Sequence, residues 1–273
     1  MKNNIKQYET INFIKSMQQF IKNHANNIQK LTQQSFDLDL RRSDGKYRNS
    51  ILQAMNNSDF AQELQCIPNP INRQGVISCY NQGLYRGFIA TLLWGGKHKE
   101  HYGSFQKIIM NNTKNKIEYN LDGICKLLQA NKINKAFNSL LNCGEFNIQY
   151  IGESYFTKIL YFISFIVPQS SQHMIKPLIL DNILQHVRCA FMIEDGLAYQ
   201  NYYTWNHQTH HLLIHKDNYS ANAYIEYCKR MNDAAAMINV APDKLEEFLF
   251  CSCPLLDGIV PRQYVKQYID ANY

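Results

Sequence analysis

One carboxylate stands out by its place in the sequence. Asp181 follows the apolar run Leu178-Ile179-Leu180 and precedes a segment, Asn182–Met192, that we predict to be a helix. A carboxylate held in one place can stabilise a positive charge that develops on a substrate, and this lowers the barrier to reaction. Asp is also a favoured residue for capping the start of a helix. Since the two roles are compatible, Asp181 is the first candidate for catalysis.

A second group lies upstream, where a glycine turn leads into a helix. Tyr150-Ile151-Gly152 predicts a tight turn, because Gly tolerates a positive φ and allows another backbone to come close. We expect a helix to begin near Glu153, with Lys158 on it. A helix that begins directly after such a turn presents free N–H groups and the positive end of its dipole, which bind phosphate well. The apolar residues that predict this helix are Phe156, Ile159, Leu160 and Ile163.

Four sequence blocks carry a resemblance to a known family. They are Phe156–Phe162 (FTKILYF), Leu178–Asp181 (LILD), Trp94-Gly95 with Tyr102-Gly103, and Pro242–Phe250 (PDKLEEFLF). Through them the chain resembles the helix-hairpin-helix DNA glycosylase superfamily. More narrowly, it is similar to a bacterial group of 8-oxoguanine DNA glycosylase fold proteins. The resemblance covers roughly residues 76–253, which is the length of a domain.

The resemblance implies an all-α fold of two helical lobes with a cleft, and a function in DNA repair. Such a protein binds duplex DNA and excises a damaged or modified base by cleaving the N-glycosidic bond. The carboxylate at the position of Asp181 stabilises the positive charge on the deoxyribose after the base has been flipped out. Family members with lyase activity carry a Lys two residues after the second hairpin glycine. Here Ser154 occupies that position, which favours a monofunctional glycosylase.

Lys158 leaves two interpretations open. It lies one turn after Ser154 on the same helix face, from which its amine could attack the sugar and form a Schiff base. Alternatively, it pairs with a carboxylate such as Asp181 or Glu153. The candidate catalytic residues are therefore Asp181 and Lys158.

The resemblance also implies that the hairpin binds the DNA backbone. The hairpin departs from the family pattern, because Tyr150 replaces the first glycine and a residue with a Cβ resists a positive φ. Trp94 and Tyr102 flank glycine-rich turns and could stack on the extruded base, although aromatics at helical spacing more often pack in the core. The predicted DNA-binding residues are Tyr150, Gly152, Ser154, Tyr155, Thr157, Lys97 and Lys99.

We expect no metal and no cofactor. The iron–sulfur cluster of some family members needs four closely spaced C-terminal cysteines, and here only Cys251 and Cys253 are close, with Cys228 upstream. Three histidines spaced four apart could share a helix face and hold Zn²⁺, but histidines in a polar surface segment are more often solvated. They are His207, His211 and His215.

The charge is uneven along the 273 residues, and the formal net charge is +6. Residues 1–135 carry 19 Lys and Arg against 9 Asp and Glu, whereas residues 136–273 carry 9 against 13. A basic half suits a polyanionic partner such as nucleic acid. No apolar run reaches membrane-spanning length, and the start lacks the apolar core of a secretory signal. The eight scattered cysteines fit reduced thiols, so we expect a cytoplasmic protein, associated with the nucleoid if bacterial.

Helical periodicity accounts for most of the chain, and few segments alternate at period two, so we predict an all-α fold. Pro68-Asn69-Pro70 breaks the pattern and separates an N-terminal helical extension, residues 1–70, from a glycosylase-like domain, residues 71–273. Residues 1–34 predict one long amphipathic helix with a break near His24. The other expected helices include Gly83–Trp94, Phe105–Asn111, Leu121–Ala130, Lys132–Leu141, Tyr219–Ile238, Lys244–Phe250 and Val260–Ile269.

Two other functions compete with the enzyme. One is a non-catalytic DNA-binding module on the same fold, and the other is a protein-interaction role through the N-terminal helix. Protein partners cannot be named from these residues. A pure binder does not need the Asp181 carboxylate, so the presence of Asp181 favours a DNA glycosylase.

Overall fold

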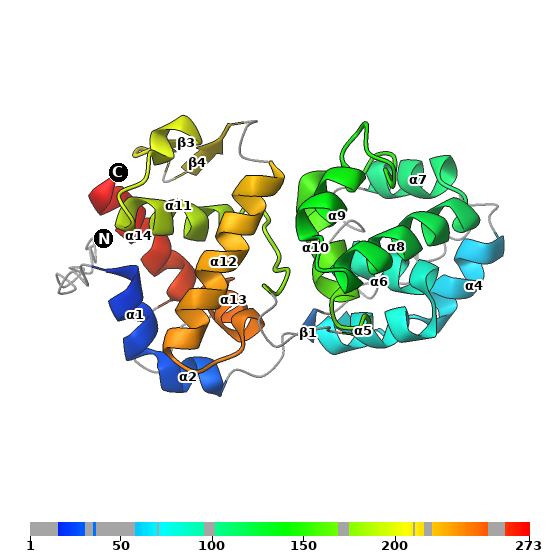
Figure 1. Cartoon of the computed structure of the whole chain (residues 1–273), viewed down its shortest axis with the longest axis horizontal. Coiled ribbons are helices and arrows are strands. Elements are labelled where there is room, and N and C mark those ends of the chain that lie inside the picture. Colours follow the sequence, from blue (N-terminus) through cyan, green and yellow to red (C-terminus); the bar gives the residue numbers. More distant parts are fainter. Residues whose placement is uncertain are drawn as a thin grey trace, which may run out of the picture.

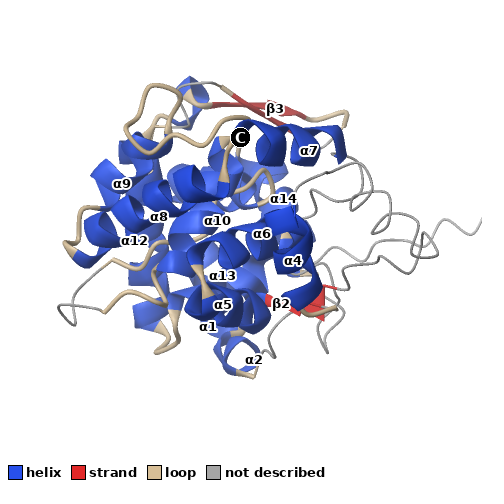
Figure 2. Ribbon diagram, turned by 90° about the vertical axis from the view of Figure 1, so that its right-hand side faces the viewer, coloured by secondary structure: helices blue, strands red, loops and turns tan. Residues whose placement is uncertain are grey.

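The computed structural model describes residues 16–30, 35–36, 58–69, 71–95, 102–168, 175–209, 211–215, 220–250 and 260–273. Helices make up most of these residues, and the strands are short (Figure 2). The predicted all-α class is confirmed. None of the helices in these ranges is long and apolar enough to cross a membrane.

The helices form two lobes (Figure 1). The central lobe contains consecutive helices from the middle of the chain. They are α4 (Ser58–Cys66), α5 (Arg73–Gln82), α6 (Leu84–Trp94), α7 (Tyr102–Asn111), α8 (Lys114–Gln129), α9 (Ile133–Leu140) and α10 (Glu153–Ile163).

The terminal lobe brings the two ends of the described chain together. It contains α1 (Met17–Asn23), α2 (Ala25–Gln29), α11 (Leu184–Glu194), α12 (Ala221–Met237), α13 (Pro242–Phe250) and α14 (Pro261–Asn272). A 3₁₀ turn, η1 (Tyr199–Asn201), and a hairpin of β3 (Tyr203–Asn206) with β4 (His211–Ile214) complete it. A two-residue pairing of β1 (Ser35–Phe36) with β2 (Ile71–Asn72) forms the other sheet.

Helix α6 is the centre of the central lobe, and it forms because the sequence LYRGFIATLLW is apolar almost throughout. It contacts α4, α5, α8 and α10, and all but two of its residues are buried. A helix that is hydrophobic on all sides must be covered on all sides. Its bounds agree with the predicted core helix.

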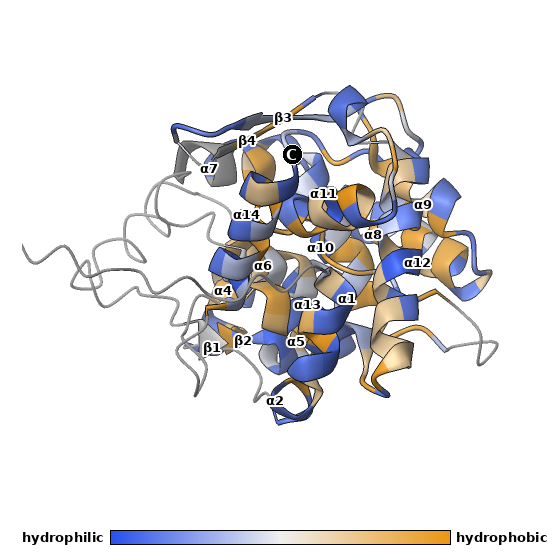
Figure 3. Cartoon of the chain, turned by 90° about the vertical axis from the view of Figure 1, so that its left-hand side faces the viewer, coloured by the Kyte–Doolittle hydropathy of each residue, from blue (hydrophilic) through white to orange (hydrophobic). Residues whose placement is uncertain are grey.

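The helices of the terminal lobe are amphipathic instead. Figure 3 shows polar and apolar residues on the same helix, for instance on α14. Its buried residues include Tyr264, Val265, Tyr268 and Ile269, spaced by one helical turn. Tyr264 stacks on Phe20 of α1, with 3.8 Å between ring centroids. The N-terminal helices therefore form part of the core of this lobe.

The described part of the expected N-terminal helix is two helices, α1 and α2, which meet at His24 where the break was predicted. Helix α1 contacts α11 and α12, and α2 contacts α13. The domain boundary at residue 70 stays a prediction.

Helix α8 begins at Lys114 rather than at the predicted Leu121, and two further elements differ from the sequence-based prediction. Helix α5 was not predicted, because its sequence RQGVISCYNQ has a weak apolar pattern and an internal glycine. Its start is fixed by Asn72, whose side chain accepts a hydrogen bond from the Gly75 amide at 2.8 Å. The histidine-rich segment is a β-hairpin rather than a helix, so His207, His211 and His215 do not share a helix face, which was the condition for the Zn²⁺ alternative.

Candidate functional site

The turn before α10 holds a strained residue, and it is not the glycine. Tyr150 adopts φ 66°, whereas Gly152 is extended with φ −101° and ψ 172°. The expectation that glycine supplies the positive φ of this turn is therefore wrong. Tyr150 is held there by its neighbours, since the Asn112 side chain bonds both the N–H (3.1 Å) and the C=O (3.2 Å) of Gln149. Buried Ile151 anchors the other side.

The first turn of α10 is fixed to the end of α6. The Tyr155 hydroxyl donates a 2.6 Å hydrogen bond to the Gly95 carbonyl. A Cβ on Gly95 would lie 2.6 Å from the Tyr155 ring, so only glycine allows this approach. Burial, with the charge of Asp181, raises the pKa of Tyr155, which keeps its hydroxyl a donor. Gly152 provides no side-chain cap at the start of α10.

The structure brings Asp181 and Lys158 together. Asp181 Oδ1 accepts hydrogen bonds from the amides of Ile183 (3.0 Å) and Leu184 (3.2 Å), so it caps the start of α11. Its other oxygen, Oδ2, lies 3.3 Å from Lys158 Nζ. The side chains are 16% and 7% exposed. The carboxylate is thus fixed through both oxygens and still has an accessible edge.

Lys158 also contacts the residue that stands in the family's lysine position. Its Nζ lies 3.2 Å from Ser154 Oγ and 3.4 Å from the Ser154 carbonyl. The predicted ion pair therefore forms with Asp181. The amine nevertheless lies beside Ser154, as the other interpretation requires.

The remaining predicted site residues lie in different places. Thr157 is buried, and its hydroxyl accepts a 3.0 Å hydrogen bond from the Leu180 amide. Trp94 is buried against Phe162, with 5.2 Å between ring centroids. Lys97 and Lys99 lie outside the described residues, as does the side chain of Tyr102 at the start of α7. Roles for these residues in DNA binding or base stacking stay predictions.

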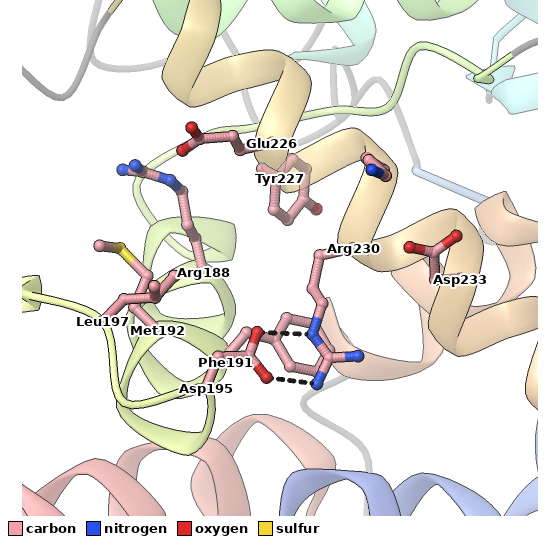
Figure 4. Close-up of a pocket in the computed structure, with 10 residues that line it drawn as sticks. Arg188, Phe191, Met192, Asp195, Leu197, Glu226, Tyr227, Arg230 and Asp233 are labelled. Atoms are coloured by element: carbon pink, nitrogen blue, oxygen red, sulfur yellow. Dashed lines mark hydrogen bonds and ion pairs between the residues drawn. The ribbon is translucent and has the colours of Figure 1, made fainter.

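A pocket of about 240 Å³ lies in the terminal lobe between α11 and α12 (Figure 4). Charged side chains surround it, and Arg230 forms two hydrogen bonds with Asp195, at 2.8 and 2.9 Å. Phe191 lies under the Arg230 guanidinium. Asp181 does not line this pocket, so a cleft that contains Asp181 stays a prediction.

Within the described residues, no group of three or more His, Cys, Asp or Glu side chains could hold a metal ion. His207 instead lies 2.9 Å from Asp270. His215 lies 2.9 Å from the Thr204 hydroxyl across the hairpin. Cys251 and Cys253 fall outside the described part of the chain.

A comparison with protein families decides the classification. Residues 29–250 match the family described as "Putative 8-oxoguanine DNA glycosylase OGG-like protein". The chain belongs to this family. The matched region includes α10, Asp181 and α13, so the resemblance carried by those blocks is confirmed. No curated protein and no solved structure matches the chain.

The structure of this OGG-like protein also shows an ion pair that the sequence did not reveal. Arg73 of α5 and Glu246 of α13 form a buried ion pair between the lobes, 2.7 Å apart. Glu246 could have been noticed in the sequence as a charged residue next to the apolar residues of PDKLEEFLF. Nothing in the sequence around Arg73 marked it in a comparable way.

Proposed function

We propose that the protein is a DNA glycosylase that binds duplex DNA and releases a damaged or modified base. The observation that carries the proposal is the Asp181 carboxylate, held by two backbone amides on one oxygen and by Lys158 on the other. Cleavage of the N-glycosidic bond leaves positive charge on the deoxyribose. A preorganised anion beside that charge lowers the barrier, because no reorganisation is needed as the charge develops.

The start of α10 supports the expected contact with the DNA backbone. Gly152 leaves this helix end without a side-chain cap, and helix N-termini attract phosphate. Tyr150, 55% exposed, lies at the turn just before it. A duplex gripped here would place its backbone one and a half helical turns from Lys158 and its partner Asp181.

In the favoured mechanism, water is the nucleophile. Its oxygen bonds to C1′, the C1′–N bond breaks, and the proton of the water ends on the departing base. Lys158 keeps Asp181 in place rather than attacking. The specific observation that favours a lyase mechanism instead is the 3.2 Å distance from Lys158 Nζ to Ser154 Oγ, because the amine then lies beside the position of the family's lysine.

Base release decides between an enzyme and a DNA-binding module. Single-turnover reactions on duplexes that each carry one modified base, 8-oxoguanine included, should show release by the wild type and a loss of roughly 10²–10³ in rate for Asp181→Asn. Equal release by both proteins would refute the role of Asp181. Binding without release on every duplex would identify a non-catalytic module.

Borohydride separates the two mechanisms. A Schiff base between Lys158 and the sugar would be reduced to a stable protein–DNA adduct, and Lys158→Ala would abolish it. The water mechanism predicts base release without any adduct.

A further inference from the structure

The segment that delivers Asp181 has no regular secondary structure. Residues 175–181 run from the central lobe to α11 without helix or strand. Leu178, Ile179 and Leu180 are buried, so their peptide groups are removed from water. Each buried backbone donor or acceptor in such a segment needs another partner. Side chains from three helices provide these partners.

Two of the partners come from α12. The Asn232 side chain accepts a hydrogen bond from the Lys176 amide (3.2 Å) and donates one to the Lys176 carbonyl (3.3 Å). The Tyr224 hydroxyl donates a 2.8 Å hydrogen bond to the carbonyl of Leu178, the residue after Pro177. Lys176 and Leu178 are thereby both fixed to α12.

The next two amides are held from different lobes. Glu246 Oε2, on α13, accepts a 2.7 Å hydrogen bond from the Ile179 amide, and its other oxygen binds Arg73. Thr157 Oγ1, on α10, accepts a 3.0 Å hydrogen bond from the Leu180 amide. The Thr157 hydroxyl remains a donor, to the Ser154 carbonyl at 3.1 Å.

Thr157 and Lys158 are adjacent on α10, and they bind two adjacent residues of the segment, Leu180 and Asp181. Thr157 binds the Leu180 amide, and Lys158 binds the Asp181 carboxylate. The same turn of helix therefore fixes both the backbone before Asp181 and its side chain. We infer that Thr157, Glu246 and Tyr224 are positioning residues, which set the Asp181 carboxylate against Lys158 through the backbone of residues 178–180.

The consequence for the rate rests on the proposed function, whereas the placement of Asp181 against Lys158 does not. The test needs one measurement for each. Thr157→Val removes the acceptor with little change in shape, and Thr157→Ser keeps the hydroxyl. Thr91→Val is a matched control, because Thr91 is also fully buried and its hydroxyl bonds Gly87 and Tyr80 in the central lobe.

The first measurement is the acylation rate of Lys158, read residue by residue by mass spectrometry, with exposed Lys126 as the internal reference. When Asp181 is no longer held, the Lys158 amine loses its partner and reacts faster. We expect a rise of roughly fivefold in Thr157→Val, with wild-type rates in Thr157→Ser and Thr91→Val. Asp181→Asn is the positive control. An unchanged Lys158 rate in folded Thr157→Val would overturn the inference.

The second measurement is single-turnover base release together with DNA affinity. Thr157→Val should lower the rate by roughly 10- to 100-fold, because small misplacement of a reacting group is costly, and this fall should exceed any change in affinity. Thr157→Ser should restore the rate. A fall in affinity with a normal rate contradicts a positioning role. If the wild type releases no base but Lys158 labelling still responds, the proposed function fails and the positioning inference stands.

Tyr224→Phe provides a second route, which remains usable if Thr157→Val does not fold. It removes the donor to the Leu178 carbonyl, three residues before Asp181. We expect a smaller rise in Lys158 acylation than in Thr157→Val. No rise in folded Tyr224→Phe would remove Tyr224 from the positioning set and, where Thr157→Val does not fold, would overturn the whole inference.

Discussion

In the described part of the chain, the ion pairs Arg73–Glu246 and Lys158–Asp181 join the lobes, and they differ in how exposed their side chains are. Arg73 and Glu246 lie 2.7 Å apart, with side chains 4% and 0% exposed. Lys158 and Asp181 lie 3.3 Å apart, with side chains 7% and 16% exposed. The first pair is sealed inside the protein. The second retains a partly exposed carboxylate.

The buried pair has further partners inside the protein. Arg73 also donates to the Tyr161 hydroxyl at 3.1 Å and lies over the rings of Tyr161 and Trp94. Burial raises the pKa of Glu246, while Arg73 and the Ile179 amide favour its charged form. A pair removed from water in this way leaves no edge that a substrate could reach, and loss of either partner would leave an uncompensated buried charge.

The open pair is suited to chemistry for the opposite reason. Asp181 is fixed by the first amides of α11, so its position does not depend on Lys158 alone. Preorganisation with partial access is what a catalytic carboxylate needs. Each prediction below either separates the two pairs or tests a group that lies beside one of them.

The largest expected effect is on stability, at the buried pair. Arg73→Met leaves Glu246 buried without its cation and should reduce the free energy of unfolding by about 3–5 kcal/mol, measured by urea denaturation. Arg73→Met with Glu246→Gln should recover part of this loss, because no charge is then left unpaired. Lys126→Ala, which breaks an exposed pair with Asp122, is the control and should cause no measurable change. A loss no larger than that of the control would contradict the assignment.

Asp181→Asn should affect the rate of base release strongly and the stability only slightly. Single-turnover base release should fall roughly 10²–10³-fold, while the free energy of unfolding changes by about 1 kcal/mol or less, because Asn also caps helices well. Lys158→Met should have a smaller effect on the rate. If Asp181→Asn unfolds as readily as Arg73→Met, the contrast between the pairs is lost.

The pH dependence of stability should come largely from His186, which lies on α11 near Asp181. Burial lowers the pKa of His186 to about 4, below its usual 6.5. From pH 6.5 downward the unfolded chain binds a proton that the folded protein does not. Stability should therefore fall between pH 6.5 and 4, by up to about 3 kcal/mol in total.

Urea denaturation at several pH values checks this, with His186→Gln as the comparison. The variant should lose stability less steeply on acidification than the wild type. Parallel curves would mean that another group, such as a member of one of the ion pairs, causes the acid sensitivity.

The smallest expected effect follows substitution of Tyr150, in the turn before α10, the helix that carries Lys158. Asn tolerates a positive φ better than Tyr, so Tyr150→Asn should raise the free energy of unfolding by roughly 0.5–1 kcal/mol. If Tyr150 contacts DNA as predicted, the same change weakens DNA affinity, measured by fluorescence anisotropy. A more stable variant with unchanged affinity would show that the ring does not contact DNA.

The sequence by itself determined the helices with strong apolar periodicity and the presence of a carboxylate at the start of one. Helices α6, α10 and α12 follow from patterns within a dozen or so residues, because helix formation and burial of one face are local properties. Asp181 as a cap and candidate catalyst was predictable for the same reason. The sequence blocks around it also predicted the family correctly.

Only the tertiary structure decided the partners. Thr157 meets Leu180 across 23 residues, and Arg73 meets Glu246 across 173, and neither pairing has a local signature. Tyr150 takes the positive φ because Asn112, 37 residues before Gln149, fixes the adjoining peptide groups. Helix α5 and the β3–β4 hairpin were missed because long-range packing outweighs a weak local pattern. Contacts between distant residues depend on how the lobes pack, and local spacing does not contain that information.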